Sequence, residues 1–151
     1  MPEFRDTGPQ ISPDDIAAVE TRIQRRLPAD LRAHYLRYNG GVPVPACFED
    51  GHGGEHQVHE FRPMLRRLHP NSPTFEETYE ALVLKKRLIP ENLVPFATNG
   101  GNDFYCMDAR TQEIYFFAMD NCANPDEAKR LVAGSLTQFL EAMIPEDELF
   151  G

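Results

Sequence analysis

The sequence predicts a single α+β domain, in which an antiparallel sheet of about four to six strands packs against helices. Between Leu93 and Phe117, three apolar runs are separated by turn residues, a pattern typical of an antiparallel meander. Helical patterns precede and follow this stretch and do not alternate with strands, as they would in an α/β protein. A chain of 151 residues suits one domain. We expect residues 1–11 to be an irregular lead-in, residues 12–145 to form the domain and residues 146–151 to form a tail.

Two short helices are predicted near the N-terminus. Ser12 is a favourable N-cap, and Pro13 suits the first helical position after it. The first helix carries one apolar stripe at helical spacing, made of Ile16, Val19, Ile23 and Leu27. A second helix is expected from Asp30 to about Tyr38. Asn39-Gly40-Gly41 ends it, because Asn and Gly tolerate the left-handed backbone that closes many helices.

The middle of the chain is predicted to contain a loop, a strand and a third helix. Residues 42–56 hold three Gly and two Pro and are expected to form a long loop. Residues 57–62 alternate in polarity, which predicts a strand. Ser72-Pro73 repeats the cap-and-proline start of the first helix. The helix that follows is expected to have an inner stripe of Phe75, Tyr79, Leu82 and the aliphatic stem of Lys86. Its outer face is expected to carry Glu76, Glu77 and Glu80.

The meander is expected to supply the sheet. Its turn Asn99-Gly100-Gly101 is predicted to be a tight hairpin turn, because Asn and Gly accept positive φ values. Beyond the meander, residues 119–125 form a connection that leads into a short helical turn. Ser135 and Gln138 form a capping box that begins the final helix.

The charge of the chain is −9 and is unevenly distributed. Residues 1–75 contain nine basic and ten acidic residues, a net of −1, whereas residues 76–151 contain six basic and fourteen acidic residues, a net of −8. An acidic half repels phosphates and argues against nucleic-acid binding. It favours a basic protein partner through electrostatic steering, although solubility alone also explains it.

The cellular compartment is inferred from three further features. No apolar run reaches the roughly 18 residues that a membrane span requires, so we expect no membrane contact. The N-terminus is charged and precedes no apolar segment, so no signal peptide is expected. Cys47, Cys106 and Cys122 are an odd number without paired spacing, which indicates reduced thiols. We therefore expect a cytoplasmic protein, and the sequence leaves its oligomeric state open.

The strongest candidate for a metal site is a His-rich group consisting of Asp50, His52, His56, His59 and Glu60. Imidazole and carboxylate groups together bind zinc. Three glycines within this segment disfavour a helix, however, and in a strand His56 and His59 would point to opposite faces. We expect a solvated loop, with no metal and no cofactor.

No catalytic residues are predicted. A nucleophilic enzyme needs a Ser or Cys beside a base and an oxyanion site. The three serines of the chain, Ser12, Ser72 and Ser135, are explained as helix caps. Cys47 lies near His52 in the sequence but without a catalytic context.

Three motifs follow one another along the chain. They are Leu27-Pro28-Ala29-Asp30 with Tyr35-Leu36 and Asn39-Gly40-Gly41, then Val94-Pro95-Phe96-Ala97 with Asn99-Gly100-Gly101-Asn102-Asp103, then Val132-Ala133-Gly134-Ser135-Leu136 with Phe139-Leu140. Together they resemble the opening, the central hairpin and the closing helix of the SUKH superfamily, named for the yeast Smi/Knr cell-wall regulators. The resemblance extends from about Ile16 to Met143. Asn102, where the family often has glycine, and the long loop 42–56 depart from the pattern.

The resemblance implies an α+β fold without a catalytic apparatus. Bacterial members are commonly immunity proteins that neutralise a polymorphic toxin, whereas eukaryotic relatives are regulators and interaction modules. We therefore expect a cytoplasmic immunity protein for a basic toxin domain. The alternatives are an interaction or regulatory module without a toxin partner, and a small metal-dependent hydrolase that uses the His-rich loop. The candidate partner-binding residues are Asn39, Gly40, Gly41, Asn99, Gly100, Gly101, Asp103, Asp108 and Asp120.

Overall fold

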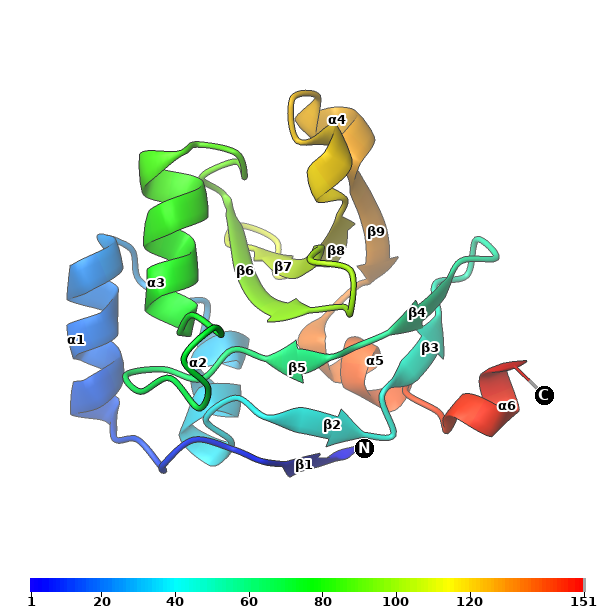
Figure 1. Ribbon diagram of the computed structural model, residues 1–151, viewed down its shortest axis with the longest axis horizontal. Coiled ribbons are helices and arrows are strands. Elements are labelled where there is room, and N and C mark those ends of the chain that lie inside the picture. Colours follow the sequence, from blue (N-terminus) through cyan, green and yellow to red (C-terminus); the bar gives the residue numbers. More distant parts are fainter. Residues whose placement is uncertain (151) are drawn as a thin grey trace.

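A five-stranded antiparallel sheet in the order β5-β6-β7-β8-β9 forms the centre of the molecule (Figure 1). This computed structural model describes residues 1–150. The strands of the sheet are β5 (Glu60–Phe61), β6 (Leu93–Thr98), β7 (Phe104–Asp108), β8 (Ile114–Phe117) and β9 (Lys129–Ala133). The predicted α+β class, and a sheet of the predicted size, are confirmed.

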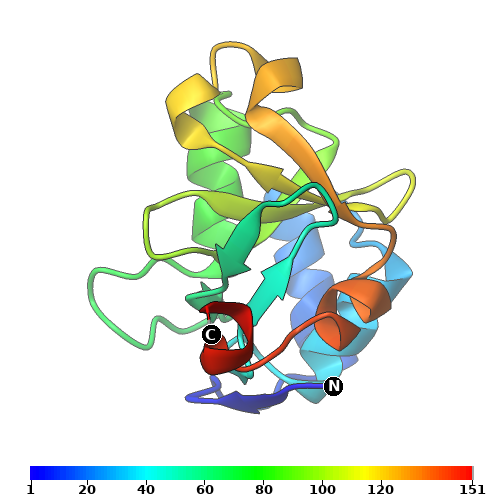
Figure 2. The same ribbon diagram turned by 90° about the vertical axis from the view of Figure 1, so that its right-hand side faces the viewer.

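Two smaller antiparallel sheets accompany the central one. They pair β1 (Glu3–Arg5) with β2 (Val42–Val44) and β3 (Cys47–Glu49) with β4 (Glu55–Gln57). The β3–β4 hairpin lies beside the C-terminal helix α6 (Glu146–Phe150), as Figure 2 shows. Cys47 forms a β-bridge with Ile144 in the segment that precedes this helix.

Strands β6 and β7 are buried along their whole length, as their apolar runs predict. Pro95 lies inside β6, where a residue without an N–H group would normally break the ladder. The register shifts between Pro95 and Ala97, so the proline lies at a bulge, where proline is tolerated within a sheet.

The β6–β7 turn differs from the predicted one in the position of its left-handed residue. The Oδ1 atom of Asn99 accepts hydrogen bonds from the N–H groups of Gly101 (2.9 Å) and Asp103 (3.0 Å). The residue with positive φ is Asn102, at 65°, and neither Gly100 nor Gly101 has a positive φ. The side chain of Asn99 therefore sets the turn, and the left-handed position falls after both glycines.

Helices α1 (Pro13–Ile23) and α2 (Ala29–Arg37) confirm the two predicted N-terminal helices. Ser12 and Asp15 form a capping box at the start of α1. After α2, Gly40 has a φ of 74°, and a Cβ there would lie 2.6 Å from the backbone nitrogen of Pro63. This close approach of two backbone segments requires glycine.

The third helix begins at Thr74 and not at the predicted Ser72. The Oγ1 atom of Thr74 accepts a hydrogen bond from the N–H of Glu77, whose carboxylate in turn accepts from the N–H of Thr74. The helix α3 (Phe75–Tyr79) then continues as the π-helix η1 (Glu80–Lys85).

The inner face of this third helix also differs from the prediction. Val83 is buried, whereas the predicted Leu82 is only half-buried and the predicted Lys86 is exposed, because the wider π turn places the next inward position four residues after Tyr79. Glu76, expected on the outer face, is buried. Its Oε2 atom accepts a hydrogen bond from the N–H of Leu65 (2.8 Å), which holds the preceding loop against the helix.

Sequence reasoning missed several short strands and the short C-terminal helix. The expected irregular lead-in contains β1, the expected loop 42–56 contains β2 and β3, and the expected tail contains α6. The strand predicted over residues 57–62 is divided into β4 and β5. Strands of two or three residues carry little periodicity of their own, and each of these depends on a partner that is distant in the sequence.

The helices that follow the meander are all short. The 3₁₀ turn η2 (Met119–Asn121) leads to α4 (Pro125–Ala128), which confirms the predicted helical turn, and α5 (Leu136–Glu141) is the predicted final helix. The Oγ atom of Ser135 accepts from the N–H of Gln138, whose side chain accepts from the N–H of Gly134, so only half of the predicted capping box forms. None of the helices in the described part of the chain has the length and apolar character of a membrane span.

The core centres on Phe139 of α5. Its ring lies between 5.1 and 6.4 Å, centroid to centroid, from the rings of Phe48, Phe61, Phe96 and Tyr105. These four residues belong to β3, β5, β6 and β7, so one side chain connects α5 with four strands. The three cysteines are free, and Cys106 is buried in β7.

Asn39 joins three segments of the chain through its buried side chain. The Nδ2 group donates to the carbonyl oxygens of Pro9 (2.9 Å) and Met64 (3.1 Å), and Oδ1 accepts from the N–H of Met64 (2.7 Å). We expect Asn39→Ala to lower the free energy of unfolding by about 2–4 kcal/mol, because it leaves buried backbone groups without partners. Urea unfolding measures this change, with Asn71→Ala at an exposed turn as the control. Equal stabilities of the two variants would contradict the structural role of Asn39.

Candidate partner-binding site

A recess of about 370 Å³ opens between the β3–β4 hairpin and the end of the central sheet where the β6–β7 turn lies. We call it the hairpin recess. Its lining comes from β4, the β6–β7 turn, β7, β8, η2, α4 and β9, and consists of Gly54, Glu55, His56, Gln57, Asn99, Tyr105, Phe116, Ala118, Asn121, Glu127, Ala128, Lys129 and Arg130. Segments that are far apart in the sequence therefore meet at one concave surface.

Two buried residues that line the hairpin recess, His56 and Tyr105, form a hydrogen-bonded chain with the buried Asp50 behind them, and we call these three side chains its floor. His56 Nε2 lies 2.9 Å from Asp50 Oδ2, and His56 Nδ1 lies 3.1 Å from the hydroxyl of Tyr105. The other Asp50 oxygen accepts hydrogen bonds from the N–H groups of His52 (2.8 Å) and Gly54 (3.0 Å). His56 therefore ties the hairpin to β7 of the central sheet through Tyr105, while Asp50 holds the other side of the ring from within the hairpin.

The ring of His56 is also held by aromatic contacts. It stacks on Phe48 with centroids 4.6 Å apart and an interplanar angle of 6°, and it meets Phe116 edge-on at 5.2 Å. Both of its nitrogens have partners and both of its sides are in contact. The ring therefore has one orientation and serves as a fixed support for the hairpin.

The pKa shifts in the floor reflect this hydrogen bonding. Burial alone would raise the pKa of Asp50, but hydrogen bonds from His56 and from the N–H groups of His52 and Gly54 outweigh it and hold the pKa well below its usual range. Burial, together with the charge of Asp103, raises the pKa of Tyr105. At neutral pH, Asp50 is therefore an anion and Tyr105 a neutral phenol.

The charges left unpaired around the hairpin recess are negative. Its two cations each lie near an acid of the same chain, since Lys129 is 3.9 Å from the exposed Asp126 and Arg130 is 3.5 Å from the buried Asp50. In contrast, the exposed residues Glu55, Asp120 and Glu127 have no cation within 4.0 Å in the described part of the chain.

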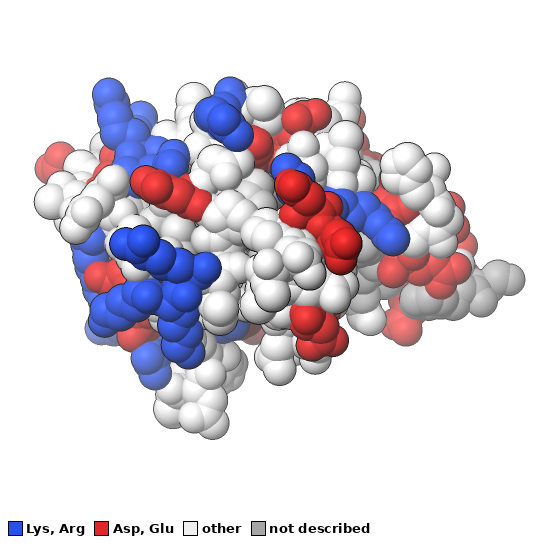
Figure 3. Space-filling model, turned by 90° about the horizontal axis from the view of Figure 1, so that it is seen from above, with Lys and Arg blue, Asp and Glu red and all other residues white. Residues whose placement is uncertain are grey.

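The surface seen from above, where α4 forms the top of the molecule in Figure 1, shows the wider charge distribution (Figure 3). Lys and Arg side chains gather toward the end that carries α1 and α3. Asp and Glu side chains predominate over the middle and toward the end that carries α6. On this face, basic side chains therefore lie mainly toward one end and acidic side chains over the middle and the other end.

Five of the sequence-predicted site residues lie together at this end of the sheet. Asn99 lines the hairpin recess and forms the β6–β7 turn with Gly100 and Gly101. Asp103 Oδ1 accepts a hydrogen bond from the N–H of Met119 (2.9 Å), which places Asp120 of η2 beside the same turn.

The remaining predicted residues lie elsewhere. Asp108 is at the opposite end of β7, where it is buried and accepts hydrogen bonds from the N–H groups of Arg110 and Thr111 in the β7–β8 turn. Asn39, Gly40 and Gly41 are buried between segments of the chain. The structure thus gives these four residues internal contacts and leaves five predicted residues near the recess.

The His-rich group is divided by the fold. Asp50 and His56 are in contact, but His52 is exposed at the hairpin tip, and Glu60 lies in β5, where it pairs with Arg62 at 3.1 Å. Within residues 1–150, no group of three or more His, Cys, Asp or Glu side chains is arranged to hold a metal ion. Cys47 is buried, and burial raises the pKa of its thiol, a shift opposite to that of an activated nucleophile.

Sequence reasoning missed the main part of the recess. Glu55, Asn121, Glu127, Lys129 and Arg130 line it, and none was among the candidate residues. Their local sequence carries no distinctive motif, and β9, which holds two of them, was not predicted. Only the excess of acidic residues after residue 75 indicated the character of this region.

The fold and the recess define a small α+β domain with a concave surface suited to contact with another molecule. The sequence matches the SMI1 / KNR4 family (SUKH-1) over residues 10–142. The match covers most of the chain, so the protein belongs to this family, and the resemblance drawn from the three sequence motifs is confirmed. No relative is found among curated proteins.

The hydrogen bonds of Asp50 predict a pH-dependent contribution to stability. Because its pKa is depressed in the folded state, Asp50 stabilises the fold above the unfolded-state pKa of about 4, and this contribution is lost as the pH falls below that value. We expect Asp50→Asn to lower the free energy of unfolding by about 2 kcal/mol at pH 7 and by less at pH 3. Urea unfolding at both pH values measures the difference, with Asp147→Asn, exposed in α6, as the control. A constant difference at both pH values would rule out the anion as its source.

Proposed function

We propose that the protein is a cytoplasmic immunity protein that binds a basic toxin domain through the hairpin recess and acts without catalysis. Membership of the SMI1 / KNR4 family (SUKH-1) supports a binding role, since this family is generally non-catalytic. The observation that carries the proposal is a set of unpaired exposed acids: Glu55 and Glu127 line the recess, and Asp120 lies beside the β6–β7 turn at its edge. Opposite charges across an interface steer the encounter of two proteins and fix their relative orientation.

The recess also offers groups that recognise a partner by hydrogen bonding. The amides of Gln57, Asn99 and Asn121 line it together with the exposed carboxylates of Glu55 and Glu127. Carboxylates accept bidentate hydrogen bonds from Arg, and amides both donate and accept. A basic loop whose Arg or Lys side chains enter the recess would meet acceptors on several sides.

The biological role is tested by co-expression. A toxin domain encoded beside this gene is expressed in bacteria with and without the protein, and survival is counted. Rescue of growth, with a complex that elutes as one species in gel filtration, is the expected result. Survival without complex formation would contradict neutralisation by binding. Growth arrest that persists despite good expression of the protein would favour a regulatory module with no toxin partner.

Charge neutralisation at the recess tests where the partner binds. We expect the triple variant Glu55→Gln/Asp120→Asn/Glu127→Gln to weaken toxin binding roughly tenfold at low salt, mainly by slowing association. We expect the affinity of the wild-type protein to fall as salt is raised, with a smaller fall for the variant. Surface plasmon resonance at two salt concentrations measures both effects.

A matched control separates local from overall charge. The variant Glu3→Gln/Asp14→Asn/Glu91→Gln removes the same charge from exposed positions outside the recess. It is expected to bind like the wild type. If both triple variants weakened toxin binding equally, the toxin would bind outside the recess, and the effect would come from the net charge of the protein alone.

A further inference from the structure

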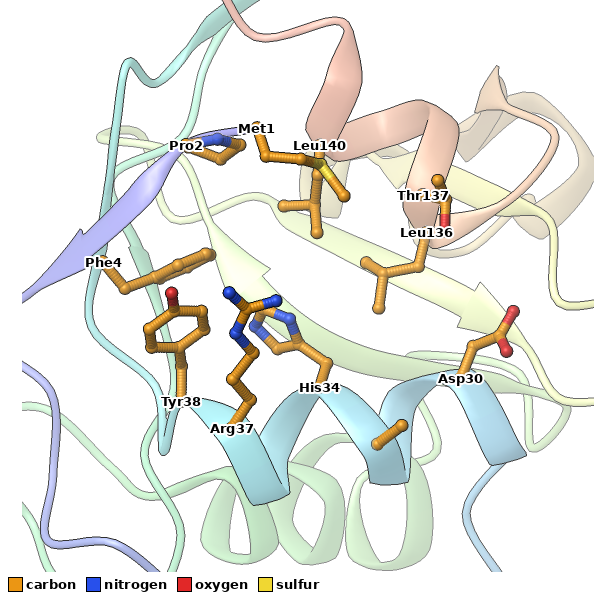
Figure 4. Close-up of a pocket in the computed structure, with 11 residues that line it drawn as sticks. Met1, Pro2, Phe4, Asp30, His34, Arg37, Tyr38, Leu136, Thr137 and Leu140 are labelled. Carbon is orange, nitrogen blue, oxygen red and sulfur yellow. The ribbon is translucent and has the colours of Figure 1, made fainter.

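A second pocket, of about 300 Å³, lies between α2, α5 and the start of the chain (Figure 4). None of the residues that line it also lines the hairpin recess. Its apolar wall comes from Phe4 on one side and from Leu136 and Leu140 of α5 on the other. We call it the α2–α5 pocket. Its volume is at the lower limit for pockets that bind small molecules.

His34 of α2 lines this pocket and has an unsatisfied polar atom. The residue is only 9% exposed, and its Nε2 atom is buried without a hydrogen-bond partner. Its ring is surrounded by aromatic side chains, with the centroids of Phe4 at 4.9 Å and Phe61 at 5.1 Å. Buried polar groups in folded proteins are almost always paired, so an orphaned nitrogen on a ring that lines a pocket suggests a partner that the chain does not supply.

Arg37 supplies a positive charge beside this nitrogen. Figure 4 shows the Arg37 guanidinium next to the His34 ring and Asp30 at the far end of the pocket. Arg37 lies over the ring of Tyr38, 5.2 Å from its centroid, and has no carboxylate within 4.0 Å among the described residues. Asp30 is seven residues from Arg37, or about 10 Å along the helix, so the two ends of the pocket differ in charge.

We propose that the α2–α5 pocket binds a small carboxylic acid with an apolar body. The carboxylate would accept hydrogen bonds from Arg37 and His34, and the body would pack against Phe4, Leu136 and Leu140. Each feature of the pocket has a role in this arrangement: the orphaned nitrogen gains a partner, the free guanidinium gains a counter-charge, and the apolar walls are covered. The carboxylate occupies the Arg37 end because Asp30 repels it from the other.

The ionisation of His34 provides an independent signature. Burial and the nearby charge of Arg37 lower the pKa of His34 to about 4, so the ring is neutral at pH 7. Besides His34, the charged or titratable side chains that line the pocket are Arg37, Asp30 and Tyr38 of α2, while α5 and the segment of Met1, Pro2 and Phe4 contribute none among the described residues. A bound carboxylate adds a negative charge beside the ring, which favours protonated imidazole, so the pKa of His34 is expected to rise when the pocket is filled.

The test uses three probes of equal chain length: hexanoate, hexan-1-ol and hexylamine. Each is titrated into ¹⁵N-labelled protein at pH 7, and amide shifts in α2 and α5 are followed by NMR. Hexanoate is expected to bind in the millimolar range and at least tenfold more tightly than hexanol, with hexylamine the weakest. The ring resonances of His34 are expected to titrate at higher pH with hexanoate present. Equal binding of acid and alcohol, or no saturable shift with hexanoate, would overturn the proposal.

Surface variants keep the test independent of folding. Arg37→Gln is expected to weaken the binding of hexanoate at least tenfold and to leave the binding of hexanol unchanged. The control Arg66→Gln removes the same charge from an exposed residue outside the pocket and is expected to change the binding of neither probe. Thr137→Phe, at an exposed position on the rim, is expected to block both probes by filling the pocket. Unchanged hexanoate binding in Arg37→Gln would exclude the assigned carboxylate position. The result does not depend on the proposed toxin binding, because the pocket and the recess share no residue.

Discussion

The packing of Phe139 against four other aromatic rings is the contact on which the rest of the structure depends. Its partners come from β3, β5, β6 and β7, so this ring unites the separate β3–β4 hairpin with the central sheet. Both surface hollows rely on it. The hairpin that borders the recess is anchored through Phe48, and the α5 helix that borders the α2–α5 pocket is anchored through Phe139 itself.

The buried histidine of the recess has all its hydrogen bonds, whereas the buried histidine of the α2–α5 pocket does not. In the recess, His56 has both nitrogens bonded, and the polar groups of its floor are used to hold the fold. In the α2–α5 pocket, His34 has a buried nitrogen without a partner, although its walls are more apolar. A satisfied histidine of this kind supports a surface, whereas an unsatisfied one leaves hydrogen-bonding capacity for a ligand. The two histidines therefore point to different roles for the two sites.

Sequence reasoning succeeded where a structure is set by neighbouring residues. The cap at Ser12 and the buried runs of β6 and β7 were predicted because capping and burial leave patterns within a few positions. It failed where contacts between residues far apart in the sequence determine the structure. Glu76 is buried because it bonds the N–H of Leu65, and β9 forms because it pairs with β8. The Asp50–His56 pair was noticed as a metal candidate, but its third member, Tyr105, is 49 residues away from His56.

The fixed ring of His56 has an entropic consequence for whatever binds at the recess. Binding surfaces built from loops usually lose conformational freedom on association, and each ordered side chain weakens the complex. Here the hairpin that carries Glu55 is already held by the contacts of His56 with Tyr105 and Phe116 and of Phe48 with Phe139. A partner would therefore meet a preorganised hairpin, and more of the interaction energy would remain as affinity. In this protein, the contacts of His56 that make the buried floor rigid also hold the exposed rim of the recess in one conformation before a partner arrives.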